Sequence, residues 1–253
     1  MVNSGIEPRQ YRQEMGEGRF RSFTTGYKET DLWIGIDPDS YREEMKEFCF
    51  ERIKHYRTLL ENYLLLDPAF GSSLIPYHTK SYAPELAIRM AWSANKANVG
   101  PMAAVAGAFA QQLGIDLMNN YKMNELAIEN GGDIFLQLIN PMILSIFAGN
   151  SPLSERIGIE IPKDMGNIGV CTSSGTVGPS LSFGKADAVM VVCKDAALAD
   201  AWATSLGNRV QVADNINTTI IFTEQIKEIL SVVIICEGKV GIRGIFDLKL
   251  IKK

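Results

Sequence analysis

The first part of the chain alternates apolar and polar residues in a pattern that predicts a β-hairpin followed by a long helix. Between about residues 19 and 36 the apolar side chains recur at the two-residue spacing of strands, with a turn near Lys28. Asp39 or Ser40 can cap a helix whose apolar positions recur at helical spacing until Asp67-Pro68 stops it. We therefore expect the longest helix directly after the opening hairpin.

Two further helices are predicted to begin at prolines, which fit the first turn of a helix. Pro84 begins the second helix and Pro101 begins the third. The third helix has little side-chain bulk, because alanines surround Gly107. Such a surface indicates either tight packing against a sheet or the close approach of a ligand.

Beyond Tyr121 the sequence changes to short apolar runs separated by Gly, Asn and Pro, which is typical of strands. The predicted strands are 125–128, 133–138, 143–147, 158–161, 168–172 and the fully apolar run 188–192. A helix at 196–206 follows, and a second hairpin is predicted at about 231–251. No repeat or linker divides the chain, so we expect one α/β (α+β) domain over residues 1–253.

Composition and charge exclude several classes of protein. Hydrophobic residues make up 46% of the 253 residues, enough for a core without disulfides. The net charge of -4, with scattered Lys and Arg, gives no attraction for nucleic acid. The four cysteines lack zinc or redox spacing, and no apolar stretch has the length of a membrane span. We expect a cytoplasmic protein with reduced thiols and with neither nucleic acid nor a membrane as partner.

The segment from Thr172 to Asp187 is the first candidate ligand site, because it combines glycines with hydroxyl side chains. Glycines let backbone N–H groups converge and hydroxyls add donors, so such a loop can hold a phosphate or a carboxylate. It is not a Walker loop, because Ala186 stands where a metal-binding Ser or Thr is required. The alternative is a polar surface turn. The candidate ligand contacts are Thr172, Ser173, Ser174, Gly175, Thr176, Ser180, Ser182 and Lys185.

Cys171 and Asp187 border this segment and are the candidate catalytic residues. Convergent N–H groups after Cys171 could lower the pKa of its thiol, as a nucleophile requires. The alternative is a small buried residue at the end of a strand. His55 and His78 have no second His, Cys or Asp at ligand spacing, so a histidine-based metal site is not predicted.

Two other segments carry candidate oxygen ligands. Asp200 and Thr204 share one face of the predicted helix, and a carboxylate with a hydroxyl suits Mg²⁺, although helices also carry this pair by chance. A second group of carboxylates flanks a Gly-Gly step, where they could bind a ribose hydroxyl or a metal; a plain strand-to-strand turn is the alternative. The candidate ligand contacts there are Glu129, Asn130, Gly131, Gly132 and Asp133.

Three of these segments, in this order, resemble motifs of the ApbE-like superfamily. AIENGGDI resembles its strand ending in Gly-Gly-Asp or Gly-Gly-Asn, CTSSG its Thr-Ser-Gly step, and ADAWATSL its Ala-Asp-Ala-Leu-Ala-Thr-Ala-Leu helix. The similarity is closer to an uncharacterised ApbE-like branch found in archaea and bacteria. That branch also shows the runs VGPMAAVAG and SLSFGKAD.

The resemblance implies a T-fold-like ApbE architecture, with a central, mostly antiparallel sheet packed with helices. It also implies that Asp200 and Thr204 bind Mg²⁺ and that FAD or FMN is the candidate cofactor, since the parent family splits FAD and transfers FMN to a protein Thr. Two features depart from the parent. Its Lys-Gly step is Ala106-Gly107 here, and its His-Ile-Ile-Asp-Pro segment has no counterpart. We therefore expect a Mg²⁺-dependent enzyme, by resemblance a flavin or phosphoryl transferase, or a binding protein for a phosphorylated or flavin-like small molecule, but not a standard FMN transferase.

Two alternatives stay open. The branch is associated with sulfur assimilation and homocysteine formation in methanogens, which would give Cys171 a sulfur-carrying role with the thiolate as the working species. A non-catalytic oligomeric scaffold that keeps the fold without the chemistry is the other alternative. We also expect the chain to form a homo-oligomer.

Overall fold

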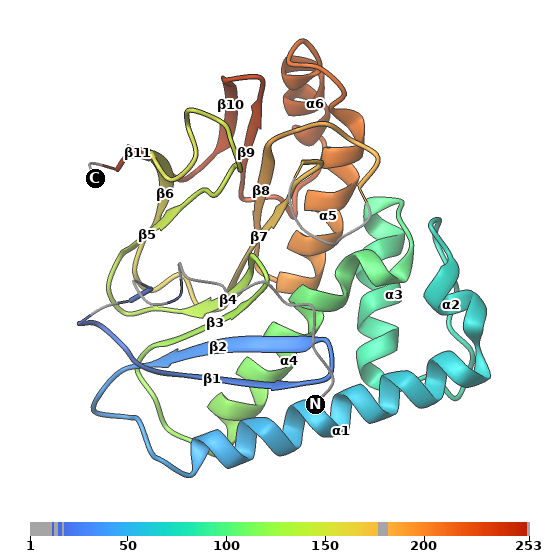
Figure 1. Cartoon of the computed structure of the whole chain (residues 1–253), viewed down its shortest axis with the longest axis vertical. Helices are drawn as coiled ribbons and strands as arrows, with labels where there is room; N and C mark the ends of the chain where they lie inside the picture. Colours follow the sequence, from blue (N-terminus) through green and yellow to red (C-terminus); the bar gives the residue numbers. More distant parts are fainter. Residues whose placement is uncertain (1–11, 13–14, 17, 177–181, 252–253) are drawn as a thin grey trace.

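The structure is built on a sheet of eight strands (Figure 1). The computed structural model describes residues 12, 15–16, 18–176 and 182–251. In spatial order the strands are β1 (Arg21–Tyr27), β2 (Thr30–Ile36), β3 (Leu126–Asn130), β4 (Asp133–Gln137), β7 (Ile168–Ser173), β8 (Ala188–Cys193), β9 (Ser231–Cys236) and β10 (Lys239–Gly244). All neighbouring pairs are antiparallel, which confirms the expected mostly antiparallel central sheet.

Burial on both faces explains why the central strands are apolar at every position. In β8, Val189 and Val191 pack in the core on one face of the sheet, whereas Met190 and Val192 pack in a separate core on the other face. Side chains alternate between the faces of a strand, so a strand covered on both sides needs apolar residues throughout.

A second, three-stranded sheet covers one of these faces. Its strands are β5 (Met142–Ser145), β6 (Ile157–Ile161) and β11 (Leu248–Leu250). Ile157, Ile159 and Ile161 of β6 pack in the same core as Val192. Because β11 pairs with β6, the hairpin predicted at about 231–251 extends only over β9 and β10.

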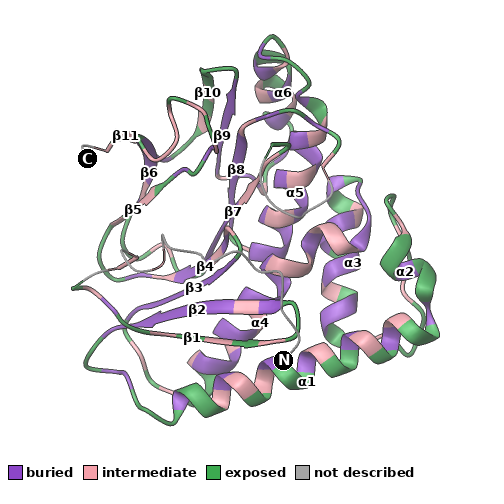
Figure 2. Cartoon of the chain, in the orientation of Figure 1, coloured by how far each residue is buried: buried purple, intermediate pink, exposed green. Residues whose placement is uncertain are grey.

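Helices cover the other face of the large sheet (Figures 1 and 2). They are α1 (Met45–Leu66), α2 (Pro68–Ser72), α3 (Glu85–Ala97), the 3₁₀ helix η2 (Pro101–Ala104), α4 (Val105–Asn120), α5 (Ala196–Arg209) and α6 (Asn215–Thr223). α4 contacts β3 and β4, while α5 contacts β7 and β8. The ends of β3, β4 and β7 therefore meet the two helices that carry the candidate metal and small-residue motifs.

The small residues of α4 permit close packing between helices. A Cβ atom at Gly107 would overlap the carbonyl oxygen of Ala196 in α5, and one at Gly169 of β7 would overlap the backbone of the same alanine. The sequence indicated either packing against a sheet or the approach of a ligand; at Gly107 the closest neighbour is instead the backbone of α5. The small side chains bring α4, α5 and β7 together around the site described next.

Candidate functional site

Asp133 and Cys171 are direct neighbours across two strands of the large sheet. The register of β4 and β7 places them opposite each other, and both are buried. The Cys171 thiol donates a hydrogen bond to the carbonyl oxygen of Ala196 at 3.3 Å, so this pair faces α5. By the alternation of a strand, Ser173 lies on the same face and Thr172 on the opposite one.

Asp200 reaches this point from α5 and accepts hydrogen bonds from the beginning of α4. The Gly107 N–H donates to Asp200 Oδ2 at 2.9 Å, and the Ala106 N–H also bonds to this carboxylate. The first N–H groups of a helix have no partner within the helix and lie at the positive end of its dipole. Asp200 therefore caps a neighbouring helix, and its hydrogen bonds hold α4 against α5.

The two carboxylates form an acid pair in which Asp133 is buried and Asp200 is partly exposed. Burial raises the pKa of Asp200 from its ordinary value of 3.8 to about 7. Burial also raises the pKa of Asp133 well above 3.8, and the charge of Asp200 raises it further. Within the described residues, no salt bridge involves either side chain. Asp200 thus keeps its proton to about neutral pH unless a cation takes the proton's place.

The turn between β3 and β4 fixes the position of Asp133. Gly131 and Gly132 have φ angles of +68° and +103°, which favour glycine. The Glu129 carboxylate accepts a hydrogen bond from the Gly132 N–H at 2.8 Å, and the Asn130 amide donates to the carbonyl oxygen of Ala106 at 3.1 Å. The segment is a strand-to-strand turn. It also places the polar side chains of Asn130 and Asp133 on the helix-covered face of the large sheet.

Thr204 and Ser173 extend the polar surface along α5. Thr204 is half-buried one turn after Asp200. A Cβ at Gly207 would lie 3.5 Å from Ser173 Oγ, so the end of β7 runs close to the same helix. The side chains of Asp200, Thr204 and Ser173 therefore offer oxygen atoms along α5 that can bind a cation.

The described residues on either side of 177–181 in the segment from Thr172 to Asp187 lie beside each other and near the C-terminal end of α5. The Gly175 N–H donates to the carbonyl oxygen of Ala186 at 2.9 Å, and the Lys185 N–H donates to that of Val210 at 2.7 Å. The hydroxyls of Ser174 and Ser182 accept hydrogen bonds from N–H groups of the loop itself. Ser180 lies outside the described residues.

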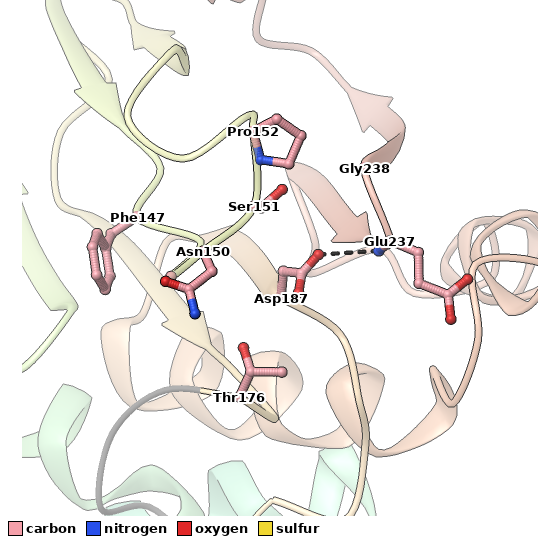
Figure 3. A pocket seen from close by; sticks show the side chains of 9 residues that line it. Phe147, Asn150, Ser151, Pro152, Thr176, Asp187, Glu237 and Gly238 are labelled. Atoms are coloured by element: carbon pink, nitrogen blue, oxygen red, sulfur yellow. Dashed lines mark hydrogen bonds between the residues drawn. The ribbon is translucent and has the colours of Figure 1, made fainter.

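The far end of this segment contributes to a separate cavity of about 660 Å³ (Figure 3). Thr176 and Asp187 line it, and the Glu237 N–H donates to Asp187 Oδ2 at 3.0 Å. The other lining residues are Phe147, Gly149, Asn150, Ser151, Pro152, Glu237 and Gly238. Two carboxylates and no basic side chain among these lining residues make this cavity unsuited to a phosphate. The predicted ligand segment is thus divided between the acid pair and this cavity.

The expectation of a lowered thiol pKa at Cys171 is wrong. Its side chain is fully buried, and burial together with the neighbouring carboxylates of Asp133 and Asp200 raises the pKa of the thiol. A buried, protonated thiol is a poor nucleophile. The sulfur-carrying alternative stays a prediction without support from this geometry.

One residue of the site region was missed from the sequence. Arg12 pairs with Glu129, 117 positions further along the chain. No local pattern in the sequence marks Arg12, because the charged segment around it is typical of exposed residues. A carboxylate beside a Gly-Gly step could have suggested a basic partner, but not which one.

Solved structures of ApbE proteins have a fold similar to that of this chain. The apo flavinyl transferase ApbE of Pseudomonas stutzeri has a TM-score of 0.55, with 10% sequence identity, over 89% of this chain and 94% of that chain. The ApbE protein of Thermotoga maritima has a TM-score of 0.55 at 11% identity, over 89% and 97%. At these identities the likeness shows the fold alone, so the chain falls in the class of proteins with an ApbE-like fold.

Sequence comparisons identify the family within this class. The family model described as AbpE bacteria matches residues 12–225. A UPF0280 protein of Methanocella arvoryzae is 41% identical over 196 residues, which are 78% of this chain and 79% of the relative. Another, of Methanocaldococcus jannaschii, is 39% identical over 222 residues, 86% and 88% of the two chains. The chain belongs to this ApbE-like family, which confirms the resemblance inferred from its motifs.

Proposed function

We propose that the chain binds a divalent cation, Mg²⁺, at Asp200 and Thr204 and uses it to hold a phosphorylated or flavin-like small molecule, with FAD or FMN as candidates. The observation that carries this proposal is the acid pair of the buried Asp133 and the partly exposed Asp200, which has no salt-bridge partner among the described residues. Two neighbouring carboxylates that are largely withdrawn from water do not both ionise readily without a compensating charge. A bound cation supplies that charge.

The carboxylate and hydroxyl oxygens of the site suit a hard cation. Mg²⁺ prefers oxygen ligands and is bound through one or two carboxylates, with water and substrate phosphates completing its shell. The described residues contain no cluster of three or more His, Cys, Asp or Glu side chains arranged to hold a metal. The Thr204 hydroxyl, main-chain oxygens, water and the ligand itself would therefore supply the remaining positions.

The cation would supply the positive charge that a diphosphate needs. A metal ion neutralises charge that develops on a transferring phosphoryl group. Here the parent family's lysine position is Ala106, whose carbonyl oxygen already accepts a hydrogen bond from Asn130. The residues of this chain then have three tasks. Asp200 and Thr204 would hold the cation, Ser173 would offer a hydroxyl to the ligand, and the carboxylate of Asp133 would add negative charge that favours the cation.

The proposal is tested with Asp200→Asn, which keeps an oxygen for the N–H of Gly107 but removes the charge. We expect the affinity for Mn²⁺, used as a Mg²⁺ analogue in calorimetry or electron paramagnetic resonance, to fall by about 100-fold or more. The matched control is Asp214→Asn, because Asp214 is 88% exposed and should leave the affinity unchanged.

Equal Mn²⁺ affinity in Asp200→Asn and the unmodified protein would contradict the proposal. So would the absence of Mn²⁺ binding in the unmodified protein at millimolar concentrations.

A further inference from the structure

Arg12 makes a buried ion pair at the end of β3. Its guanidinium donates from Nε to Glu129 Oε2 at 2.7 Å, and a second nitrogen lies 2.6 Å from the same oxygen. The fork also donates to the carboxylate of Asp31 at 2.7 Å and to its carbonyl oxygen at 2.9 Å. The side chains of Arg12 and Glu129 are 8% and 2% exposed, so water screens this pair little.

Glu129 connects Arg12 to the acid pair. While Oε2 of Glu129 receives Arg12, its Oε1 accepts the hydrogen bond from the Gly132 N–H. This N–H belongs to the two-residue turn whose glycines both have positive φ. The residue before the turn is Asn130, which bonds to Ala106, and the residue after it is Asp133. The orientation of the Glu129 carboxylate therefore fixes the turn that places Asp133 opposite Cys171, where it is influenced by the charge of Asp200.

We propose that Arg12 is a positioning residue for the cation site, acting from the other face of the sheet through Glu129 and the Gly131-Gly132 turn. The inference rests on the proposed function, since it concerns affinity for the same cation. Residues that hold a metal ligand in place without touching the metal commonly change its affinity strongly when they are replaced.

A second arginine–glutamate ion pair, at the opposite end of β3, provides a matched control. Arg19 donates two hydrogen bonds to Glu125, which precedes β3, at 3.0 and 2.6 Å. Glu125 likewise accepts the N–H groups of Ile139 and Asn140 and so fixes a loop after β4. Glu125 is buried and paired like Glu129, but it lies four residues away from it, at the end of β3 opposite the acid pair.

The test compares Arg12→Gln with Arg19→Gln in the full chain, with Mn²⁺ as the probe. Both changes leave a buried glutamate without its arginine, so both should lower the thermal midpoint. We expect Arg12→Gln to weaken Mn²⁺ binding by about 10- to 100-fold. Arg19→Gln should change it by less than about twofold, as for a distant site.

Two further measurements separate positioning from general destabilisation. In amide hydrogen exchange, the Gly132 N–H should lose protection in Arg12→Gln and keep it in Arg19→Gln. Arg12→Lys retains the charge without the fork, so its Mn²⁺ affinity should lie between those of Arg12→Gln and the unmodified protein. If Arg12→Gln does not fold, Arg12→Lys against Arg19→Lys makes the same comparison.

Equal Mn²⁺ affinity in the two glutamine variants, or in the two lysine variants, would overturn the role of Arg12 while leaving the proposed function intact. Failure of the unmodified protein to bind Mn²⁺ would overturn both.

Discussion

At the scale of single residues, the burial of Asp133 and Asp200 is costly unless something compensates their charge. Burial penalises an ionised carboxylate, and a second carboxylate nearby adds repulsion. The N–H groups of Ala106 and Gly107 compensate Asp200 only in part, because its pKa remains raised. Such unfavourable arrangements concentrate at functional sites, where a ligand completes the electrostatics.

The first prediction at this scale concerns the pH dependence of stability without metal. The pKa of Asp200 is about 7 in the folded protein and about 3.8 in the unfolded chain, so between these values the folded state holds more protons. The free energy of unfolding in EDTA should therefore fall as the pH rises from about 4 to about 7, by on the order of 3 kcal/mol from Asp200. Urea titrations across this range measure the slope.

Asp200→Asn cannot ionise, so its stability should depend less on pH in this window and should exceed that of the unmodified protein at pH 8 in EDTA. A parallel dependence in the two proteins would show that Asp200 titrates normally.

At the scale of elements, strands and helices could be predicted from local spacing, but their partners could not. The apolar run at β8 and the helix at α5 lie within three residues of their predicted bounds, because burial patterns are local. α6 was missed, since its apolar residues alternate with polar Asn and Thr without a clear helical stripe. Asp133, Cys171 and Asp200 were separate candidates, and only the register of β4 with β7 and the packing of α5 bring them together.

The second prediction compares two glycines in these helices. Gly107→Ala would place a methyl group against the backbone of Ala196, which cannot move aside, so we expect a loss of about 2 kcal/mol or more. Gly207→Ala meets only Ser173 at ordinary contact distance, and the better helix propensity should stabilise it by about 0.5 to 1 kcal/mol. Chemical denaturation of both variants tests the pair, and similar effects of the two changes would contradict the packing of α4 on α5.

At the scale of the whole molecule, the net negative charge of the chain means that an anionic ligand would need a cation in order to bind. The chain carries a net charge of -4, and the cavity shown in Figure 3 is lined by the carboxylates of Asp187 and Glu237. No helix among the described residues is long and apolar enough to span a membrane. The cytoplasmic location, the homo-oligomer and the exclusion of nucleic acid stay predictions from the sequence.

The third prediction follows from this charge distribution. On the proposed function, protein purified gently in Mg²⁺ should retain a phosphorylated small molecule, because its phosphate would be held through the cation at Asp200 and Thr204, and EDTA should release it. Native mass spectrometry before and after EDTA measures both states. A ligand that survives EDTA, or one without a phosphate, would contradict binding through the cation.

The distances along the chain that the site spans have a consequence for how the protein is made. The Gly107–Asp200 hydrogen bond joins residues 93 positions apart, and the Arg12–Glu129 pair joins residues 117 apart. Contacts of such separation form late in folding, since long loops must close first. A cation bound at this junction would stabilise the finished fold and no earlier intermediate. The supply of Mg²⁺ during synthesis would then determine how much folded protein accumulates, and not only how much ligand the protein binds.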